Sequence, residues 1–426
     1  MNMKLLLINH SFQINYYSRR WQLFAEAFPD VEVVLLAPAE YTWYKDKGYS
    51  FGFSKKVEAK VIDKDNYHVR LFKRVDHKVI GWSSPDFKRI IVEESPDVIY
   101  HIGMHNCASL VQVLSIRNKY LKKAKVVAFS MRGPAMNLKK WKRSYSFLKN
   151  MVYLFLYPLR RLMLNFINSN TDAFFCHYPD AVKCFRDEGY TGPIYMQTQV
   201  GVNSEWFHED SVARSKIRNQ YHISESTYVF GSATRFSPEK GVDDILSALP
   251  VDGDWKYIMM GGGANEEIQR LIDIIEMRGI RDKVIVTGFV DWYDISQYWN
   301  AIDCAIHVPR TTDHWEETFS LSIVQPMIIG KPVIGSSSGS VPYQIGDKDL
   351  IVEEGNIEGL KEKLCWAMNN RDEMLRKGKA LQHRTETSFE VKSLNSLFYE
   401  TLVEDIMTGQ YNHLKADMTL YGKQQG

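Results

Sequence analysis

Two cations in one turn are the first candidates for chemistry in this sequence. Arg235 and Lys240 stand five residues apart, after a β-run at Tyr228–Ala233 and before a predicted helix. Fixed positive charges suit a dianionic phosphate group, and the unpaired N–H groups at a helix start add a positive dipole end at the same place. The turn is therefore expected to hold a diphosphate.

A carboxylate begins a second junction between a loop and a helix. Glu317 is followed by an apolar run and, eight residues later, by Gln325. Eight residues are roughly two helical turns, so the two polar groups are expected on about the same face of the helix. One junction can thus bind a diphosphate, and the other can form hydrogen bonds with sugar hydroxyls.

The order of these motifs resembles the donor half of a retaining glycosyltransferase of the GT-B fold, most like glycosyltransferase family four (glycosyl transferases group one). The matching residues are Arg235, Lys240, Gly241, Glu317, Phe319, Met327, Gly330, Pro332, Val333 and Ile334. Between them, Gly261-Gly262-Gly263 and Gly288-Phe289-Val290 stand where the family has a Gly-rich turn and a strand end, and Asp303 and Pro309 fit its next segment. Each motif is weak alone, but the ordered set is specific.

The resemblance implies a role for each matched residue. Arg235 and Lys240 would bind the diphosphate and stabilise the charge that develops on the leaving group. Glu317 would form hydrogen bonds with hydroxyls of the transferred sugar, and Phe319 two residues later favours it over the adjacent Glu316. Gln325 would lie near the ribose. The rest of the predicted donor site is Gly241, Gly262, Phe319, Ser320 and the backbone of Gly288, Phe289 and Val290, which would face the base.

Three positions depart from the family pattern. Gln325 replaces the second glutamate of the Glu-x7-Glu motif, which keeps hydrogen-bonding capacity and loses the charge. Pro326 follows it and would remove a backbone hydrogen bond inside a helix, at a cost of about 3 kcal/mol if nothing compensates. Ser320 stands where the family usually has glycine, so the backbone is expected to approach the donor less closely.

The acceptor side has weaker signals. His10, His101, His105 and Arg132 all follow or end predicted strands, where a base or an acceptor ligand could lie. We interpret Arg132 as a contact for an anion or a hydroxyl group. His105 is the candidate for a catalytic histidine in the cleft, although a structural histidine is the more frequent case.

Strand-like and helical runs alternate along the chain. Strands are predicted at Lys4–Asn9, Val31–Ala37, Val98–His101, Lys125–Phe129 and Asp172–Cys176. Alternation of this kind favours an α/β fold with parallel sheets covered by helices on both faces. With the resemblance, it predicts a GT-B architecture of two Rossmann-like doubly wound domains facing across a cleft. Residues 1–205 would bind the acceptor and 206–387 the donor, while a final helix in 388–426, capped by Ser388, crosses back to the first domain.

Charge is distributed unevenly. From Val98 to Thr171 there are thirteen Lys and Arg residues and no Asp or Glu. Within this part, residues 138–167 alternate cations with aromatic residues, as in segments that lie at a membrane interface beside anionic lipid. A buried helix with a solvated basic edge is the plainer alternative. Nucleic acid is a third and unlikely partner, because no motif for reading it is present.

Other features restrict the compartment and the cofactors. Five cysteines without metal-ligand spacing are expected to be free thiols in a reducing cytosol. Apolar runs are too short to span a membrane, and the longest candidate, Met151–Tyr157, stops at Pro158. The chain is thus expected in the cytoplasm, peripherally at the inner face of the cell membrane. Three Asp-x-Asp pairs, Asp63/Asp65, Asp252/Asp254 and Asp347/Asp349, lie in turn-like settings, so no metal or other cofactor is expected.

These observations predict a metal-independent, retaining glycosyltransferase. It would transfer a sugar from a nucleoside-diphosphate sugar to a lipid-linked or polysaccharide acceptor during the biosynthesis of a glycan such as a cell-surface polysaccharide. Two alternatives stay open. One is a nucleotide-sugar epimerase of the GT-B fold, which could use similar phosphate contacts. The other is a non-catalytic partner that binds sugar nucleotides, which Gln325 and Pro326 motivate.

Overall fold

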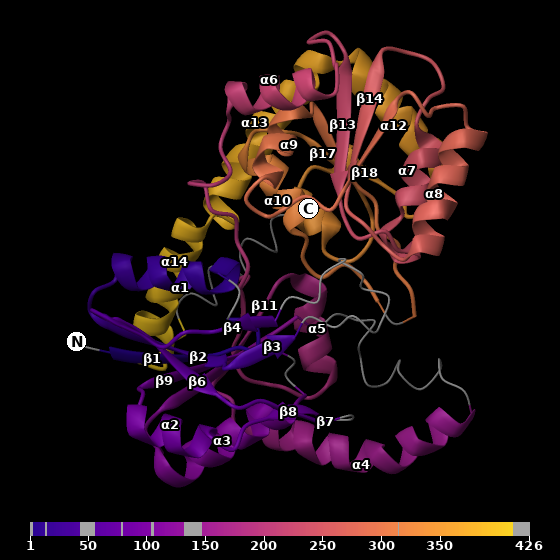
Figure 1. Ribbon diagram of the computed structural model, residues 1–426. Helices are drawn as coiled ribbons and strands as arrows, with labels where there is room; N and C mark the ends of the chain where they lie inside the picture. The colour runs from indigo at the N-terminus through magenta and orange to yellow at the C-terminus, as the bar shows by residue number, and fades with distance from the viewer. Residues whose placement is uncertain are drawn as a thin grey trace. The chain divides into compact units, whose positions relative to one another are not determined.

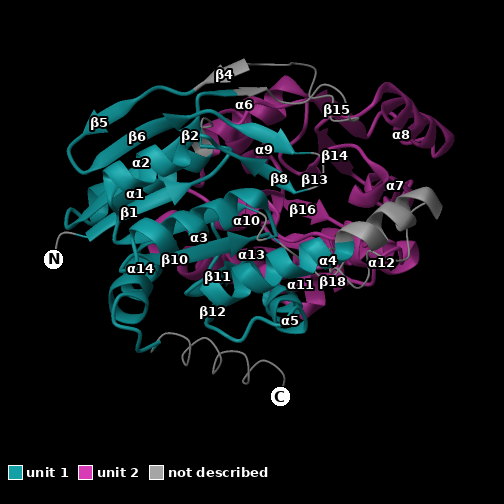
Figure 2. Cartoon of the chain, turned by 90° about the horizontal axis from the view of Figure 1, so that it is seen from below, with its two compact units in different colours: residues 1–43, 55–199, 394–426 teal, residues 44–54, 200–393 magenta. Residues whose placement is uncertain are grey.

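The computed structural model describes residues 3–12, 15–42, 56–77, 80–103, 106–131, 147–313 and 315–411 (Figure 1). They form two compact units (Figure 2). Unit 1 contains the described residues up to Gln199 and those from Leu394 onward, and unit 2 contains Val200–Ser393. The predicted boundaries, after residue 205 and before residue 388, each differ by six residues from the boundaries between these two units.

Unit 1 is built on an eight-stranded sheet in the order β12-β11-β10-β9-β1-β2-β6-β5. All neighbours are parallel except β5 and β6, which form an antiparallel edge. The central strands are buried on both sides, as near-continuous Leu, Ile and Val runs predict. The strands are β1 (Met3–Ile8), β2 (Val31–Pro38), β5 (Ile62–Lys64), β6 (Tyr67–Phe72), β9 (Val98–Gly103), β10 (Lys125–Ser130), β11 (Ala173–Cys176) and β12 (Ile194–Met196).

Helices cover both faces of this sheet (Figure 1). Helices α1 (Asn15–Ala27) and α14 (Val391–Glu400) lie on one face, and α2 (Phe87–Glu94) and α3 (Ala108–Tyr120) on the other. Helix α4 (Phe147–Asn170) packs beside α3, and α5 (Pro179–Asp187) follows β11. Two short antiparallel pairs, β3 (Glu40–Thr42) with β4 (Lys56–Glu58) and β7 (Val75–His77) with β8 (Gly81–Ser83), complete the unit.

Unit 2 is built on a six-stranded, fully parallel sheet in the order β15-β14-β13-β16-β17-β18. The chain winds outward from β13 in one direction and then restarts at β16 in the other, which makes the β13–β16 boundary a topological switch point. The strands are β13 (Tyr228–Ala233), β14 (Trp255–Met260), β15 (Val284–Gly288), β16 (Cys304–His307), β17 (Val333–Ser336) and β18 (Ile351–Val352). Ligands in such sheets bind beyond the carboxyl ends of the strands.

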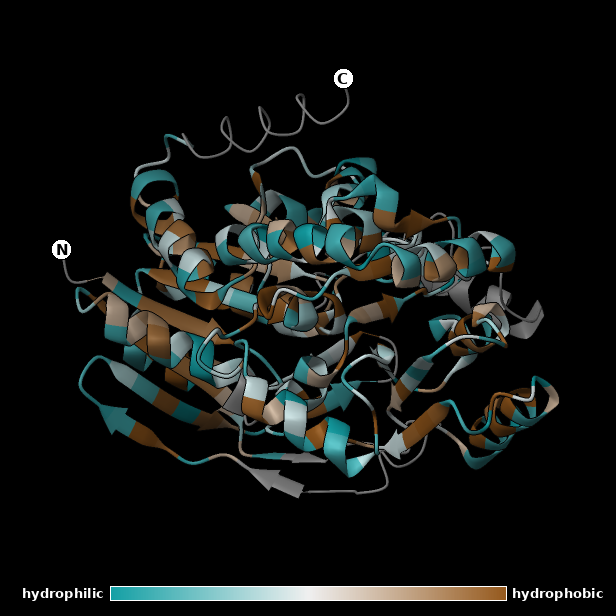
Figure 3. Cartoon of the chain, turned by 90° about the horizontal axis from the view of Figure 1, so that it is seen from above, coloured by the Kyte–Doolittle hydropathy of each residue, from teal (hydrophilic) through white to brown (hydrophobic). Residues whose placement is uncertain are grey.

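Two layers of helices enclose the second sheet (Figure 1). One layer contains α6 (Ser211–Gln220), α9 (Ile295–Ala301), α10 (Leu321–Ile328) and α13 (Arg371–Ser388), and the other contains α7 (Val242–Ala248), α8 (Asn265–Met277) and α12 (Ile357–Asn369). Shorter elements are the 3₁₀ turns η3 (Pro238–Lys240) and η4 (Lys348–Leu350), and α11 (Val341–Ile345). Hydrophobic residues concentrate on the strands of both sheets (Figure 3), where each unit has its own core.

The α/β prediction is confirmed. Helix α4 continues through Pro158 to Asn170. One local prediction, the cap of the helix that returns to unit 1, is wrong. Ser388 is the last residue of α13, and the start of α14 is capped by Glu390, whose Oε2 accepts hydrogen bonds from the N–H groups of Lys392 (2.6 Å) and Ser393 (3.2 Å). No helix in the described ranges has both the length and the apolarity that crossing a membrane requires.

A buried arginine holds the returning chain on unit 1. The guanidinium of Arg20, on α1, donates to Oδ1 of Asn395 (3.0 Å) and to the carbonyl of Thr198 (2.8 Å). The side-chain amide of Asn395 donates back to the carbonyl of Arg20 (3.2 Å). Next to this clamp, the ring of Phe398 packs edge-on against Trp21, with 5.3 Å between ring centroids. A charged group and an aromatic cluster therefore dock α14 together.

Replacing Asn395 by leucine should loosen α14 selectively. The change leaves a buried cation without one acceptor, which typically costs about 1–3 kcal/mol. We expect amide hydrogen exchange across residues 391–406 to accelerate roughly tenfold, or about 1.4 kcal/mol in local opening free energy. Ser396→Ala, one residue along on the exposed side of the helix, is the control. Equal exchange in both variants would show that the clamp contributes nothing.

Candidate functional site

The turn after β13 contains both predicted phosphate-binding cations. It closes through η3, and Gly241 then takes the left-handed conformation, with φ of 65°, before α7 begins. A Cβ atom at Gly241 would lie 2.1 Å from the carbonyl oxygen of Val308, so only glycine lets this turn pack against the segment after β16. The two loops at the switch point are therefore in direct contact.

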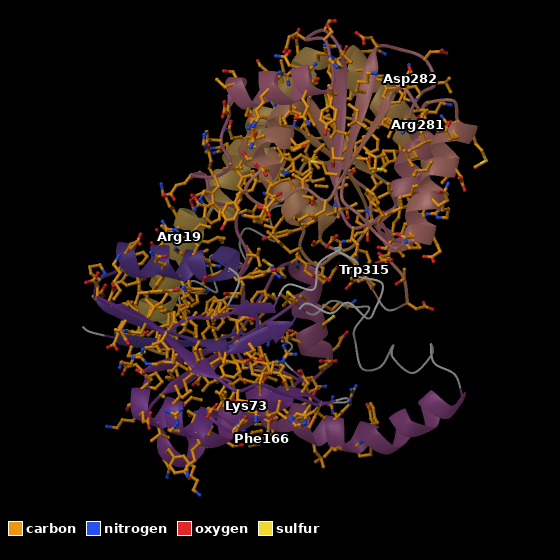
Figure 4. All side chains as sticks on the ribbon, in the orientation of Figure 1. Arg19, Lys73, Phe166, Arg281, Asp282 and Trp315 are labelled. Atoms are coloured by element: carbon orange, nitrogen blue, oxygen red, sulfur yellow. The ribbon has the colours of Figure 1, made fainter. Side chains whose placement is uncertain are left out.

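The two cations have different partners. The guanidinium of Arg235 pairs with Glu239 in the same turn (3.1 Å). The ammonium of Lys240 lies 2.7 Å from Oε2 of Glu317, which comes from the loop before α10. The ring of Trp315 covers that ammonium, with Nζ 4.3 Å from the ring centroid. In Figure 4, Trp315 lies at the opposite end of unit 2 from Arg281 and Asp282, which precede β15. The structure thus joins two predicted residues, Lys240 and Glu317, at the carboxyl edge of the sheet.

Helix α7, which follows this turn, carries two acidic residues near its start. It is seven residues long, and Asp243 and Asp244 occupy its first turn. Arg310 neutralises both acids: its Nη2 lies 3.1 Å from Asp243, and its Nε donates to Asp244 (2.7 Å). The N–H of Arg310 also donates to the carbonyl of Glu239 (2.8 Å). Arg310 therefore fastens the segment after β16 to the turn that carries Lys240.

Glu317 is held from three directions. Its side chain is 8% exposed, and Oε2 accepts a hydrogen bond from Nε2 of His307 (3.1 Å) in addition to its contact with Lys240. Its carbonyl accepts the N–H of Ser340 (2.8 Å). Gly339, with φ of 49°, allows that approach, since a Cβ there would lie 2.1 Å from the same carbonyl oxygen. Backbone and side chain are both fixed.

The charges in this cluster are well defined. Burial alone would raise the pKa of Glu317, but the charge of Lys240 and the hydrogen bond from His307 outweigh burial and lower that pKa to about 2. Burial lowers the pKa of His307 below its usual value, although Glu317 acts in the opposite direction. At neutral pH the cluster therefore contains an ionised carboxylate, a charged ammonium and a neutral imidazole whose Nε2–H donates.

The predicted Gly-rich segments lie at the carboxyl ends of the neighbouring strands β14 and β15. The carbonyl of Gly262 accepts the N–H of Phe236 (2.7 Å), and the N–H of Gly261 donates to the carbonyl of Gly288 (2.9 Å). Gly288 has φ of 72°, Phe289 is 55% exposed, and Val290 is half-buried. This part of the carboxyl edge therefore offers backbone and an exposed aromatic side chain.

Ser320 and Phe319 are fixed at the start of α10. The N–H of Ser320 donates to Oε1 of Gln344 (2.8 Å), and Nε2 of Gln344 donates back to the carbonyl of Ser320 (3.0 Å). Gln344 is fully buried. The ring of Phe319 contacts Phe389, with centroids 5.8 Å apart. These contacts fix the backbone at the start of α10, three residues after Glu317.

Gln325 lies deeper than a ligand contact requires. It is 2% exposed, its Oε1 accepts the indole N–H of Trp299 (3.0 Å), and its Nε2 has no hydrogen-bond partner among the described residues. Pro326 follows it inside α10, which continues to Ile328. The ribose role of Gln325 stays a prediction, and any ribose contact would have to use the amide N–H groups.

Unit 1 contains the predicted acceptor-side residues, and two of them, His105 and Arg132, lie outside the described residues. His101, within β9 and two residues before its end, is fully buried with its Nε2 2.8 Å from Oγ of Ser109, and burial lowers its pKa to about 3. Burial likewise lowers the pKa of His10 to about 4, and the charge of Arg74 acts in the same direction. Both imidazoles are neutral at physiological pH.

The Asp-x-Asp pairs have structural partners. The ammonium of Lys377 lies 2.7 Å from Asp347 and 3.1 Å from Asp349. Asp63 accepts from Arg70 (2.6 Å), and Asp254 accepts from Thr227 (2.8 Å). Within the ranges given above, no cluster of three or more His, Cys, Asp or Glu side chains is placed to hold a metal ion.

Sequence reasoning missed four residues of this site: His307, Trp315, Arg310 and Gln344. His307 ends a strand whose other residues are apolar, and Gln344 lies in a short helix, so neither belongs to a motif. Trp315 and Arg310 precede Glu317 by two and seven residues. Their proximity to Glu317 was the only available signal.

Comparison with known proteins finds a family match within unit 2. The family described as glycosyl transferases group 1 matches residues 213–384. A GDP-mannose-dependent alpha-(1-6)-phosphatidylinositol monomannoside mannosyltransferase of Mycobacterium tuberculosis is 28% identical over 189 residues, 42% of this chain and 48% of the relative. An O-antigen chain mannosyltransferase B of Escherichia coli is 21% identical over 186 residues, 42% of this chain and 47% of the relative. The chain thus spans about half the length of these curated relatives.

Solved structures extend the likeness to the whole chain at the level of fold. Sucrose-phosphate synthase from Thermosynechococcus elongatus has a TM-score of 0.68 at 15% identity, covering 94% of this chain and 98% of that one. HepE of Anabaena, in complex with UDP and glucose, has a TM-score of 0.63 at 17% identity, covering 94% and 100%. Residues 213–384 therefore match the family of glycosyl transferases group 1, within a chain that has the fold of GT-B glycosyltransferases.

Proposed function

We propose that this chain is a metal-independent, retaining glycosyltransferase that uses a nucleoside-diphosphate sugar. The observation that carries the proposal is the buried contact between Lys240 and Glu317 at the switch point of the family-matched unit. The ammonium of Lys240 could bind the diphosphate, and the adjacent carboxylate of Glu317 could bind the sugar. Incubating the protein with candidate donors and acceptors, and determining the anomeric configuration of the product, tests the whole statement.

The proposed chemistry follows from charge. Breaking the bond between the sugar and the diphosphate leaves negative charge on the departing phosphate oxygens. Lys240 and Arg235 would stabilise that charge, as fixed cations in a partly water-excluded site do. Glu317, already ionised, would accept hydrogen bonds from sugar hydroxyls and orient the ring. Because these cations are part of the protein, a metal ion is not needed for this role.

The acceptor class rests on the relatives. One acts on a phosphatidylinositol mannoside and another on the O-antigen chain, by their names. We infer by analogy a lipid-linked or polysaccharide acceptor in the biosynthesis of a cell-surface glycan. His10, His105 and Arg132 remain the proposed residues of the acceptor side. A thermal-shift screen across nucleotide sugars would identify the donor first, because a ligand that binds the native state raises its apparent stability.

Two other functions predict different outcomes in the same assays. An epimerase would convert the donor without any acceptor and release an epimeric sugar. A non-catalytic partner would bind donor and transfer nothing to a broad acceptor set. The buried position of Gln325 and the proline after it favour the second of these two over the first.

We also propose that unit 1 binds anionic membranes, at the cytoplasmic face of the cell membrane. Residues 138–146 of the basic segment lie outside the described residues, but the later part of α4 carries two exposed leucines, Leu159 (56%) and Leu162 (66%). They flank Arg160 and Arg161 on a helix without acidic residues. Apolar side chains beside cations are what an anionic bilayer surface attracts.

The phosphate-binding role predicts a large kinetic effect. Arg235→Ala and Lys240→Ala should each lower kcat/KM by roughly 10²–10³, as the loss of one transition-state donor often does. Lys361→Ala, which removes an exposed lysine of the same unit, is the matched control. Folding is checked by circular dichroism. Near-native turnover in both site variants would rule out this assignment.

The ribose role of Gln325 predicts a smaller effect. Gln325→Ala should weaken donor binding by about 0.5–1.5 kcal/mol, the size of a neutral hydrogen bond, whereas Gln325→Glu should bind nearly as well as the native protein. Isothermal titration with the donor measures both. Because Gln325→Ala also removes the acceptor of Trp299, a fall in thermal stability with unchanged affinity would assign this residue a structural role only.

Membrane binding predicts a two-part response to salt. The contribution of the cations should shrink as the Debye length falls from about 10 Å at 0.1 M to about 3 Å at 1 M, whereas that of the leucines should persist. We expect Leu159→Ser with Leu162→Ser to reduce co-sedimentation with anionic vesicles at both salt concentrations. The control changes Val212 and Met277, exposed apolar residues of unit 2, to serine. Equal binding to neutral and anionic vesicles would contradict the proposal.

A further inference from the structure

Glu317 uses only one of its two carboxylate oxygens in the described structure. Lys240 and His307 both contact Oε2, at 2.7 and 3.1 Å. No described residue forms a hydrogen bond with Oε1. The two oxygens therefore differ: Oε2 is bonded to two protein donors, and Oε1 can accept a hydrogen bond from another partner.

The two partners of Oε2 differ in how firmly they are held. His307 is the last residue of β16, is 5% exposed, and pairs in register with Gly335 of β17. Its side chain is short and buried. Lys240, by contrast, extends a long flexible side chain from a 3₁₀ turn. A diphosphate entering this turn would compete with Glu317 for the ammonium of Lys240. It would compete far less for the N–H of His307, because that donor is neutral.

This competition would leave Glu317 in need of a second contact. A buried carboxylate that loses its cation becomes costly, and it either takes up a proton or rotates toward water unless another donor holds it. His307 is the one described residue besides Lys240 whose side chain donates to Glu317. It can do so as a neutral imidazole, so it adds no charge that would attract the phosphate.

We propose that His307 is a positioning residue, which keeps Oε2 of Glu317 in place while Lys240 serves the diphosphate, and so presents Oε1 to the transferred sugar. The inference rests on the proposed function and extends it by naming a residue outside the motifs. Two other groups face this carboxylate or its partners: the ammonium of Lys240 from η3 and the ring of Trp315 from the preceding loop. The N–H of Ser340 bonds the backbone carbonyl of Glu317 instead. None of them can replace the side-chain donor from β16.

A spectroscopic test needs no catalysis. Nitrogen-15 NMR of labelled histidine side chains, with His307 assigned by its loss in His307→Gln, reports the proton on each ring nitrogen. We expect a neutral ring with the proton on Nε2 at pH 7, and a changed Nε2 shift in Glu317→Gln. A charged ring at pH 7, or a proton on Nδ1, would overturn the proposal.

The kinetic test separates positioning from binding and from folding. In His307→Ala we expect kcat to fall roughly 10- to 100-fold, the effect of losing a hydrogen bond to a charged group. The dissociation constants of GDP and UDP, titrated separately, should stay within about threefold of native, because Lys240 is intact. His307→Gln, whose amide can reach the same oxygen, should restore kcat to within about threefold. Ile306→Val, a small packing loss on the same strand, is the control.

Each remaining outcome decides the matter. If His307→Gln folds and stays as slow as His307→Ala, or if Ile306→Val is equally slow, His307 does not act by donating to Glu317. If His307→Ala does not fold, the glutamine variant and the NMR measurement still decide. Failure of the proposed function itself would appear differently, as a native protein that transfers no sugar although its His307 gives the expected spectrum.

Discussion

A buried carboxylate that must stay ionised is the constraint on which unit 2 depends. Glu317 is almost fully enclosed, and an isolated charge in such a place would be strongly unfavourable. Its stability requires a cation from one loop, a neutral donor from the end of a strand, and a backbone held by a third segment. Those three segments follow or end β13, β16 and β17. The parallel topology brings the strand ends together, and the charge in turn keeps the loops in contact.

Glycine and arginine together make that contact possible. At Gly241 and Gly339 a side chain would collide with a backbone carbonyl of the opposite loop, so close packing there depends on the missing Cβ. Arg310 neutralises the acids at the start of α7 and also reaches the turn that carries Lys240. Close packing thus depends on two glycines, and charge balance on Arg310, which lies outside the predicted donor site. An arrangement of this kind is preorganised, since little reorganisation is left for the moment of reaction.

The sequence predicted the parts of this structure that have a local pattern. Alternating apolar runs gave the two parallel sheets, and the ordered motifs located Lys240 and Glu317, because spacing along a strand–loop–helix unit largely fixes where such residues lie. Contacts between distant segments could not be predicted. His307 looks like one more residue of a buried strand, and only the register of β16 brings it to Glu317. The pairing of Arg235 with Glu239 likewise depends on the turn geometry.

Unit 1 is completed by the last part of the chain. Its core includes Phe398, Leu402 and Ile406, which are synthesised after every residue of unit 2. During translation, one apolar face of the earlier-made sheet therefore stays uncovered while some two hundred further residues are synthesised. Synthesis proceeds at roughly 5–20 residues per second. The described residues of unit 2 lie in one stretch, Val200–Ser393, which can finish folding first. Folding of unit 1 can therefore end after that of unit 2, although its synthesis begins earlier.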